Sequence, residues 1–96
     1  MSSGYVIANV EVTNPAQYEE YKKWSSAAMQ AHGAEVCTRG GKVEVLEGDW
    51  SPSRVVILKF PSFEKAKAFY ESPEYLKARE ARAGAAVMRM IAVEGV

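Results

Sequence analysis

The chain has 96 residues, of which 48% are hydrophobic and 25% are charged, and its 12 basic and 12 acidic side chains cancel. This composition is typical of a single globular domain, which we expect to span residues 1–96. The two charge signs intermix without a basic cluster that could neutralise phosphates, which argues against a nucleic-acid partner. No apolar run approaches the roughly 20 residues that span a bilayer, which argues against a membrane protein.

The N-terminus and the cysteine content indicate the cellular compartment. The first residues lead directly into a strand-like segment, without the basic and apolar stretches of a signal peptide. The single cysteine, Cys37, has no partner for an internal disulfide and suits a reducing environment. We therefore expect a cytoplasmic protein. Because Cys37 lies in a predicted strand with nothing nearby to activate its thiol, we expect a small buried side chain there.

The first third of the chain predicts a strand followed by a helix. Residues 5–12 are rich in β-branched side chains, and their polar residues recur at every second position. Asn14 suits the N-cap of a helix and Pro15 its first position. This helix is expected to run to about His32, with Gly33 as its stop. The two faces of the strand carry Val6, Ala8, Val10 and Val12 on one side, and Tyr5, Ile7, Asn9 and Glu11 on the other.

The middle of the chain predicts two further strands, at residues 35–39 and 54–60, with an extra short strand between them. Gly40-Gly41 permits a turn or bulge because glycine tolerates positive φ. Residues 42–47 continue as strand in this interpretation, since valine and glutamate alternate. Residues 48–53 form an irregular stretch that includes Trp50, which is either a lid or part of a dimer contact.

The last third predicts a bent helix and a final strand. Ser62 suits an N-cap, and Ser72-Pro73 then interrupts the helix and starts a second helical piece over residues 74–83. Residues 87–93 form the last strand. The order β-α-β-β-α-β predicts a ferredoxin-like α+β fold, in which helices cover one face of an antiparallel sheet.

Apolar side chains on both faces of the predicted sheet indicate a homodimer. Helices on one side leave the other side uncovered, and an uncovered face normally carries polar side chains. Here the opposing sets are Val56, Leu58 and Phe60 against Val55 and Ile57, and Met88 and Met90 against Val87, Ile91 and Val93. A second copy related by two-fold symmetry would cover this patch. Asn9 and Glu11 would then line an internal space.

Arginines are the main candidates for a ligand site. Arg39 and Arg54 lie at strand ends beside glycine or proline turns, and Arg79 and Arg82 follow on the last helix. Since arginine binds carboxylates through paired hydrogen bonds, a small organic acid is a reasonable ligand. The alternative is a set of structural ion pairs with Glu44, Asp49, Glu74 or Glu80.

Three other residues complete the candidate site. Tyr75 could line a cavity or pack with one end in water, and Asn9 faces the possible dimer space. His32, the only histidine, suits the negative end of its helix and would be a general base if it faced a pocket. No Cys, Asp or Glu lies at ligand spacing around it, and no dinucleotide motif is present, so neither a metal nor a cofactor is predicted.

A series of short motifs, in order along nearly the whole chain, resembles the bacterial family named domain of unknown function 1330. The motifs are Arg39-Gly40-Gly41, Glu44-Val45-Leu46-Glu47-Gly48, Trp50-x-Pro52-x-Arg54, Phe60-Pro61-Ser62 and Tyr70-x-Ser72-Pro73-Glu74-Tyr75. The resemblance implies a ferredoxin-like fold in the dimeric α+β barrel superfamily. Relatives by fold include cofactor-free monooxygenases, haem-degrading enzymes, lactone isomerases and stress-response proteins, so activity would be carried over by fold analogy only.

Two functions therefore stay open at this level. The first is a small-molecule binder or enzyme in which Arg39, Arg54 and Tyr75 supply polar contacts, with chemistry that is cofactor-free or uses a bound organic cofactor. The second is a non-catalytic dimeric stress-response or regulatory module, in which the arginines are structural and side chains fill the barrel.

Overall fold

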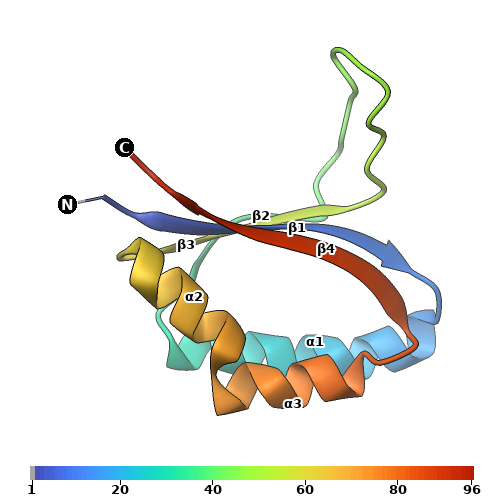
Figure 1. The fold of residues 1–96 in the computed structure, drawn as a ribbon. Coiled ribbons are helices and arrows are strands. Elements are labelled where there is room, and N and C mark those ends of the chain that lie inside the picture. The colour runs from blue at the N-terminus through green and yellow to red at the C-terminus, as the bar shows by residue number, and fades with distance from the viewer. Residues whose placement is uncertain (1) are drawn as a thin grey trace.

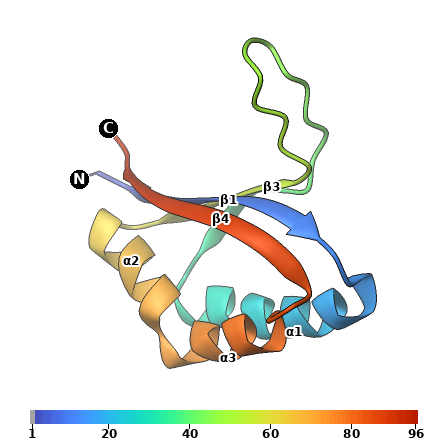
Figure 2. The same ribbon diagram turned by 45° about the vertical axis from the view of Figure 1, so that its right-hand side comes forward.

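The computed structural model describes residues 2–96, in which an antiparallel four-stranded sheet carries three helices on one face (Figure 1). A second view shows the same layering (Figure 2). The strand order is β2-β3-β1-β4. This confirms the predicted ferredoxin-like α+β fold. The elements are β1 (Gly4–Val12), α1 (Pro15–Ala31), β2 (Glu35–Arg39), β3 (Val55–Phe60), α2 (Phe63–Glu71), α3 (Pro73–Ala81) and β4 (Ala86–Glu94).

Side-chain caps set the helix boundaries where the sequence predicts them. The Asn14 side chain accepts a hydrogen bond from the Gln17 N–H at 3.2 Å, which satisfies a free donor at the start of α1. Ser72 serves two helices: its hydroxyl donates to the Phe69 carbonyl at 2.7 Å and accepts from the Tyr75 N–H at 3.2 Å. The bend between α2 and α3 therefore follows from one serine and the proline after it.

The core lies between the sheet and the helices. Alternate residues of β1 and β3 point toward the helices, where aromatic rings from α2 and α3 meet them. Phe69 lies 5.1 Å from Phe60 and 4.7 Å from Tyr75 between ring centroids. The buried residues of the strands are Val6, Ala8, Val10, Leu58 and Phe60, and those of the helices include Tyr18, Tyr21, Ala28, Ala66, Phe69, Tyr75 and Ala78.

The other face of the sheet has no helix over it and carries large apolar side chains. On β4, Val87 is 56% exposed and Ile91 is 59% exposed. Tyr5, Ile7 and Asn9 of β1 lie at the alternate positions that share this face. The two-faced apolar pattern expected from the sequence is therefore present.

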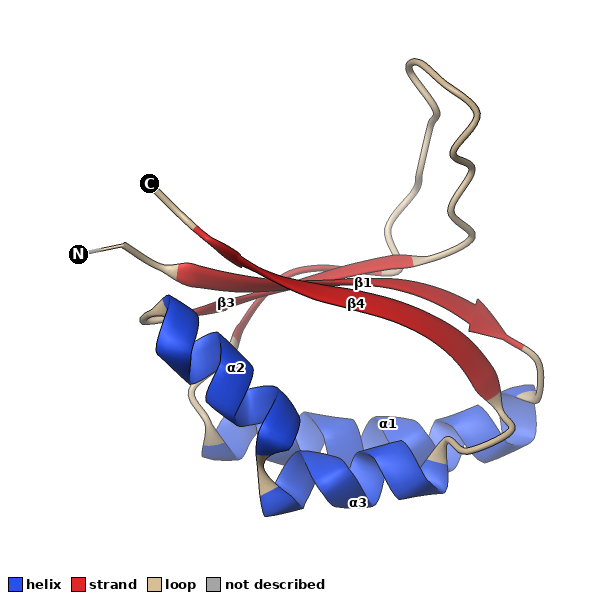
Figure 3. Ribbon diagram, viewed as in Figure 1, coloured by secondary structure: helices blue, strands red, loops and turns tan. Residues whose placement is uncertain are grey.

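The predicted extra strand over residues 42–47 is wrong. In the structure residues 40–54 form a loop that rises from the side of the sheet away from the helices (Figure 3), and Gly41–Trp50 are all exposed. A strand needs a neighbour to satisfy its backbone groups, and no strand of residues 2–96 lies beside this segment. Gly40 and Gly48 turn the loop, with φ of 74° and 90°.

The expected burial of Cys37 is also wrong, because the side chain is exposed. Cys37 lies on β2, which is an edge strand of the sheet, at an irregularity in the pairing with β3 between Val36 and Thr38. An edge strand is covered by a neighbour on one side only, which leaves this thiol open.

None of the described helices combines the length and the apolar composition needed to cross a bilayer.

Candidate functional site

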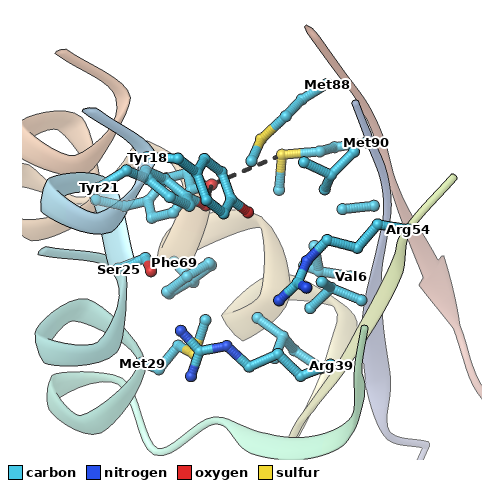
Figure 4. A pocket seen from close by; sticks show the side chains of 15 residues that line it. Val6, Tyr18, Tyr21, Ser25, Met29, Arg39, Arg54, Phe69, Met88 and Met90 are labelled. Atoms are coloured by element: carbon cyan, nitrogen blue, oxygen red, sulfur yellow. Dashed lines mark hydrogen bonds between the residues drawn. The ribbon is translucent and has the colours of Figure 1, made fainter. Parts of the chain in front are cut away.

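A small cavity lies inside the core, between the sheet and α1 (Figure 4). We call it the arginine cavity. Its volume of about 30 Å³ has room for about two water molecules. Its apolar wall consists of Val6, Ala8, Val10, Met29, Val56, Leu58, Phe69, Met88 and Met90, and its polar groups belong to Tyr18, Tyr21, Ser25, Arg39, Arg54 and Tyr75.

Two neighbouring strands bring Arg39 and Arg54 to this cavity. Arg39 ends β2 opposite Val56 of β3, and Arg54 precedes β3, so both side chains start from the same end of the strand pair. Their guanidinium groups extend from the sheet into the space between the sheet and α1 (Figure 4). Arg39 donates a hydrogen bond to the Ser26 hydroxyl at 3.3 Å.

Gly40 makes room for the second guanidinium. A Cβ atom at Gly40 would collide with Arg54, and the backbone there has φ of 74°. The positive φ favours glycine here, and a larger residue would also displace the Arg54 guanidinium. Gly40 therefore leaves room for this guanidinium in its observed position.

Opposite the arginines, two buried phenols form a pair. The Tyr21 and Tyr75 hydroxyl oxygens lie 2.7 Å apart, and the Tyr75 hydroxyl also donates toward the Met90 sulfur at 3.8 Å. Burial, followed by the adjacent Tyr75 phenol, raises the pKa of Tyr21. Burial also raises the pKa of Tyr75, although the hydrogen bond to Tyr21 and the charge of Arg82 act in the opposite direction. Both phenols are neutral near pH 7 and can donate a proton in a hydrogen bond.

The arginines of residues 2–96 have no carboxylate partner. The ion pairs found there join Lys22 to Glu19, Lys23 to Glu20 and His32 to Glu74. The alternative of ion pairs from Arg39, Arg54, Arg79 and Arg82 to Glu44, Asp49, Glu74 or Glu80 is therefore wrong for the described chain.

Two of these arginines also keep a buried donor without a partner. The Nε atoms of Arg54 and Arg82 are inaccessible to solvent and make no hydrogen bond. A buried charge or donor that lacks a partner is costly. An anion placed at Arg54 would relieve this cost, and the cavity lies directly beside it.

A larger groove adjoins the cavity. It runs between α2 and β4 and has a volume of about 440 Å³. Val6, Met88 and Met90 line both spaces. We call it the lateral groove, and its other lining residues are Ala66, Lys67, Tyr70, Glu71, Arg82, Ile91 and Ala92.

The structure brings some predicted site residues together and separates others. Arg39, Arg54 and Tyr75 line the arginine cavity. Arg82 lines the neighbouring lateral groove, and its guanidinium carbon lies 5.9 Å from the centroid of the Tyr21 ring. Tyr21 was not among the sequence candidates, although its place on the buried face of α1 was the available signal.

The two remaining candidates lie elsewhere. His32 follows α1, where its Nε2 lies 2.6 Å from Glu74 Oε1 and its ring packs edge-on against Phe69, so it joins helices instead of lining the cavity. Asn9 lies on the uncovered face, in a hollow of about 350 Å³ beneath the loop together with Trp50 and Arg89.

The arrangement of potential metal ligands among the described residues does not favour a metal site. Within residues 2–96, no three His, Cys, Asp or Glu side chains gather as a possible metal site. The polar groups of the arginine cavity are guanidiniums, phenols and the Ser25 hydroxyl, and a guanidinium repels a metal ion.

The fold and the cavity define a ferredoxin-like protein with an arginine-bearing interior. The chain belongs to the family described as a domain of unknown function, DUF1330, whose model matches residues 3–96. This confirms the family indicated by the sequence motifs. No curated protein matches the sequence.

Solved structures with low sequence identity share the fold. A protein of unknown function from Rhodopseudomonas palustris has a TM-score of 0.75 at 21% identity, covering 99% of this chain and 83% of that chain. SnoaB, a cofactor-independent oxygenase from Streptomyces nogalater, has a TM-score of 0.65 at 14% identity, covering 97% and 92%. A dimeric ferredoxin-like protein of unknown function from Thermobifida fusca has a TM-score of 0.59 at 15% identity, covering 96% and 92%.

Proposed function

We propose that this protein binds a small organic carboxylate between the sheet and the helices, with Arg54 as the main contact. The observation that carries the proposal is the buried Nε of Arg54, which has no hydrogen-bond partner and borders a cavity. A guanidinium offers donors in a fixed geometry that matches a carboxylate. A bound acid would supply the negative charge that the surrounding side chains lack.

The neighbouring groups suit the same ligand. Arg39 is exposed and makes a single long hydrogen bond, so it is free to turn toward an anion beside Arg54. Of the two protons of the Tyr21–Tyr75 pair, one lies between the hydroxyls, and the other points from Tyr75 toward the Met90 sulfur, a weak acceptor that a carboxylate oxygen would replace. Two cations and a neutral donor would then surround the carboxylate.

Any catalysis at this site would be cofactor-independent in our proposal. The phenols of Tyr18, Tyr21 and Tyr75 are the groups of the cavity that could move a proton, because the other polar lining groups are a serine hydroxyl and guanidiniums. The shared fold with SnoaB, a cofactor-independent oxygenase, supports such chemistry by analogy only. We therefore propose binding as the primary function.

Replacement of Arg54 tests the proposal. Acetate and propionate at constant ionic strength should shift the Arg54 Nε–H resonance and raise the melting temperature of the wild type. At a hundredfold excess over Kd, the ligand should add about 2.7 kcal/mol to the free energy of unfolding. Arg54→Met should lose both effects. It should also melt higher than wild type without ligand, since relief of an unpartnered donor is worth about 1–3 kcal/mol.

The matched control is Arg89→Met, which removes an exposed arginine from the uncovered face of the sheet. It should keep both the resonance shift and the thermal shift. An unchanged thermal shift in Arg54→Met would show that the anion binds elsewhere and would refute the site.

We also propose that the protein is a homodimer formed through the uncovered face of the sheet. The exposed Val87 and Ile91 support this, and the similar protein from Thermobifida fusca is described as dimeric. Asn9 and Trp50 would then lie within the interface region. A non-catalytic dimeric stress-response or regulatory module is the alternative function, and it would follow if no acid bound the wild type while the dimer formed.

The proposed setting is the bacterial cytoplasm. The free, exposed thiol of Cys37 and the bacterial sources of the similar structures support it. Fractionation of cells that express the native gene would test this, with recovery outside the cytoplasmic fraction as the opposing result.

A further inference from the structure

The arginine cavity is too small for the organic part of an acid. Its volume of about 30 Å³ suits a carboxylate head that displaces water, but not a chain or a ring. The lateral groove next to it, of about 440 Å³, is within the usual size range of ligand pockets. A bound acid would therefore need both spaces.

Two methionines separate these spaces. Met88 and Met90 line both the cavity and the groove, and both are half-buried. Methionine is unbranched and changes its conformation at small energetic cost, so these two side chains can move aside to admit a ligand. The Tyr75 hydroxyl, which donates toward the Met90 sulfur, lies at the junction.

The groove is lined by apolar side chains and has a net positive charge. Ala66 and Ala92 add to the methionine surface, and the charged lining residues are Lys67, Arg82 and one acidic residue, Glu71. The Arg82 Nε is buried without a hydrogen-bond partner. A groove of this kind attracts an anion and accepts its hydrocarbon part.

We propose that the ligand is an amphipathic monocarboxylate, whose head lies at Arg54 and whose chain or ring passes between Met88 and Met90 into the lateral groove. This inference rests on the proposed function, because it takes the carboxylate position from there. It adds the chemical class of the ligand and its direction of entry, which is from the β4 edge of the sheet.

A chain-length series tests the ligand class. Wild-type protein with ¹³C-methyl methionine is titrated with acetate, butyrate, hexanoate and octanoate and followed by NMR. Affinity should rise about fourfold for each methylene that the groove buries. The Met88 and Met90 methyl resonances should shift with the longer acids and stay in place with acetate, while the Arg54 Nε–H resonance responds to all of them.

A larger side chain in the groove should remove the dependence of affinity on the chain length of the acid. Ala92 lies on the inner face of β4 in line with Met88 and Met90, so Ala92→Phe should reduce hexanoate affinity to that of acetate. Ala92→Leu gives a smaller obstruction, should the phenylalanine variant not fold. Ala68→Phe, at an exposed position of α2, is the matched control and should bind like the wild type.

The outcomes separate this inference from the proposed function. Equal affinity along the series, with all shifts dependent on Arg54, would overturn the amphipathic class and leave the anion site standing. Hexanoate binding lost in Arg82→Met but kept in Arg54→Met would place the head in the groove and overturn the orientation. Failure of every acid to bind would overturn the anion site, and the inference with it.

Discussion

At the scale of one residue, the binding role that we propose for Arg54 opposes the stability of the free protein. Its charge is held partly inside the protein beside a cavity, and its Nε has no hydrogen-bond partner. Such a group destabilises the free protein and gains most from a ligand of opposite charge. Lys would be a poor substitute there, because a single ammonium cannot offer paired donors to a carboxylate.

The buried phenols predict a loss of stability at high pH. In the unfolded chain a tyrosine ionises near pH 10, but burial keeps Tyr21 and Tyr75 protonated in the folded state to higher pH. The folded state then binds more protons than the unfolded state. Their contribution is therefore complete below pH 10, and above it the free energy of unfolding should fall by up to about 1.4 kcal/mol per pH unit for each phenol.

Urea unfolding between pH 9 and pH 11.5 measures this slope. Tyr21→Phe should make it shallower than in wild type, whereas Phe69→Leu, which removes a ring of the same aromatic cluster but no phenol, should leave it unchanged. Equal slopes for wild type and Tyr21→Phe would contradict the assignment of the buried phenol.

At the scale of elements, Ser72 is the joint between α2 and α3. Its one hydroxyl ends the first helix and begins the second. This joint directs α3 along α1, and so places Tyr75 against Tyr21. A substitution at Ser72 should therefore disturb the packing of α3 along α1 as well as the helix cap itself.

Ser72→Ala should lower the free energy of unfolding by about 1–2 kcal/mol, because it removes the N-cap of α3 and the bond to Phe69. Urea unfolding at neutral pH provides the measurement. Ser53→Ala, at an exposed loop position, is the control and should stay within about 0.5 kcal/mol of wild type. A loss at Ser72 no larger than at Ser53 would contradict the capping role.

The loop over residues 40–54 shows where element prediction failed. Val43 and Val45 alternate with polar residues as in a strand, and this pattern is a local signal. Strand formation depends on a partner, which the described chain does not supply there. The same alternation does form a strand in β1, because β3 and β4 pair with its two edges.

For the whole molecule, the uncovered sheet face decides the state of assembly in our proposal. Wild-type protein should scatter light as twice the chain mass of 10.6 kDa at micromolar concentration. Ile91→Lys should give the monomer mass, because it places a charge on the apolar face at a 59% exposed position of β4. Leu76→Lys, at a 46% exposed position of α3 on the helical side, should remain dimeric. A monomer mass for the wild type would refute the homodimer.

Apart from the extra strand over residues 42–47, the sequence by itself determined the order of elements, the caps at Asn14 and Ser72, and the residues that share a strand face, because these depend on neighbours within a few positions. It also contained the family motifs. Only the tertiary structure decided that Arg39, Arg54 and Tyr75 meet at one cavity while Asn9 and His32 lie outside it. Alternation along a strand separates two faces, but the packing of the helices selects which face becomes the interior.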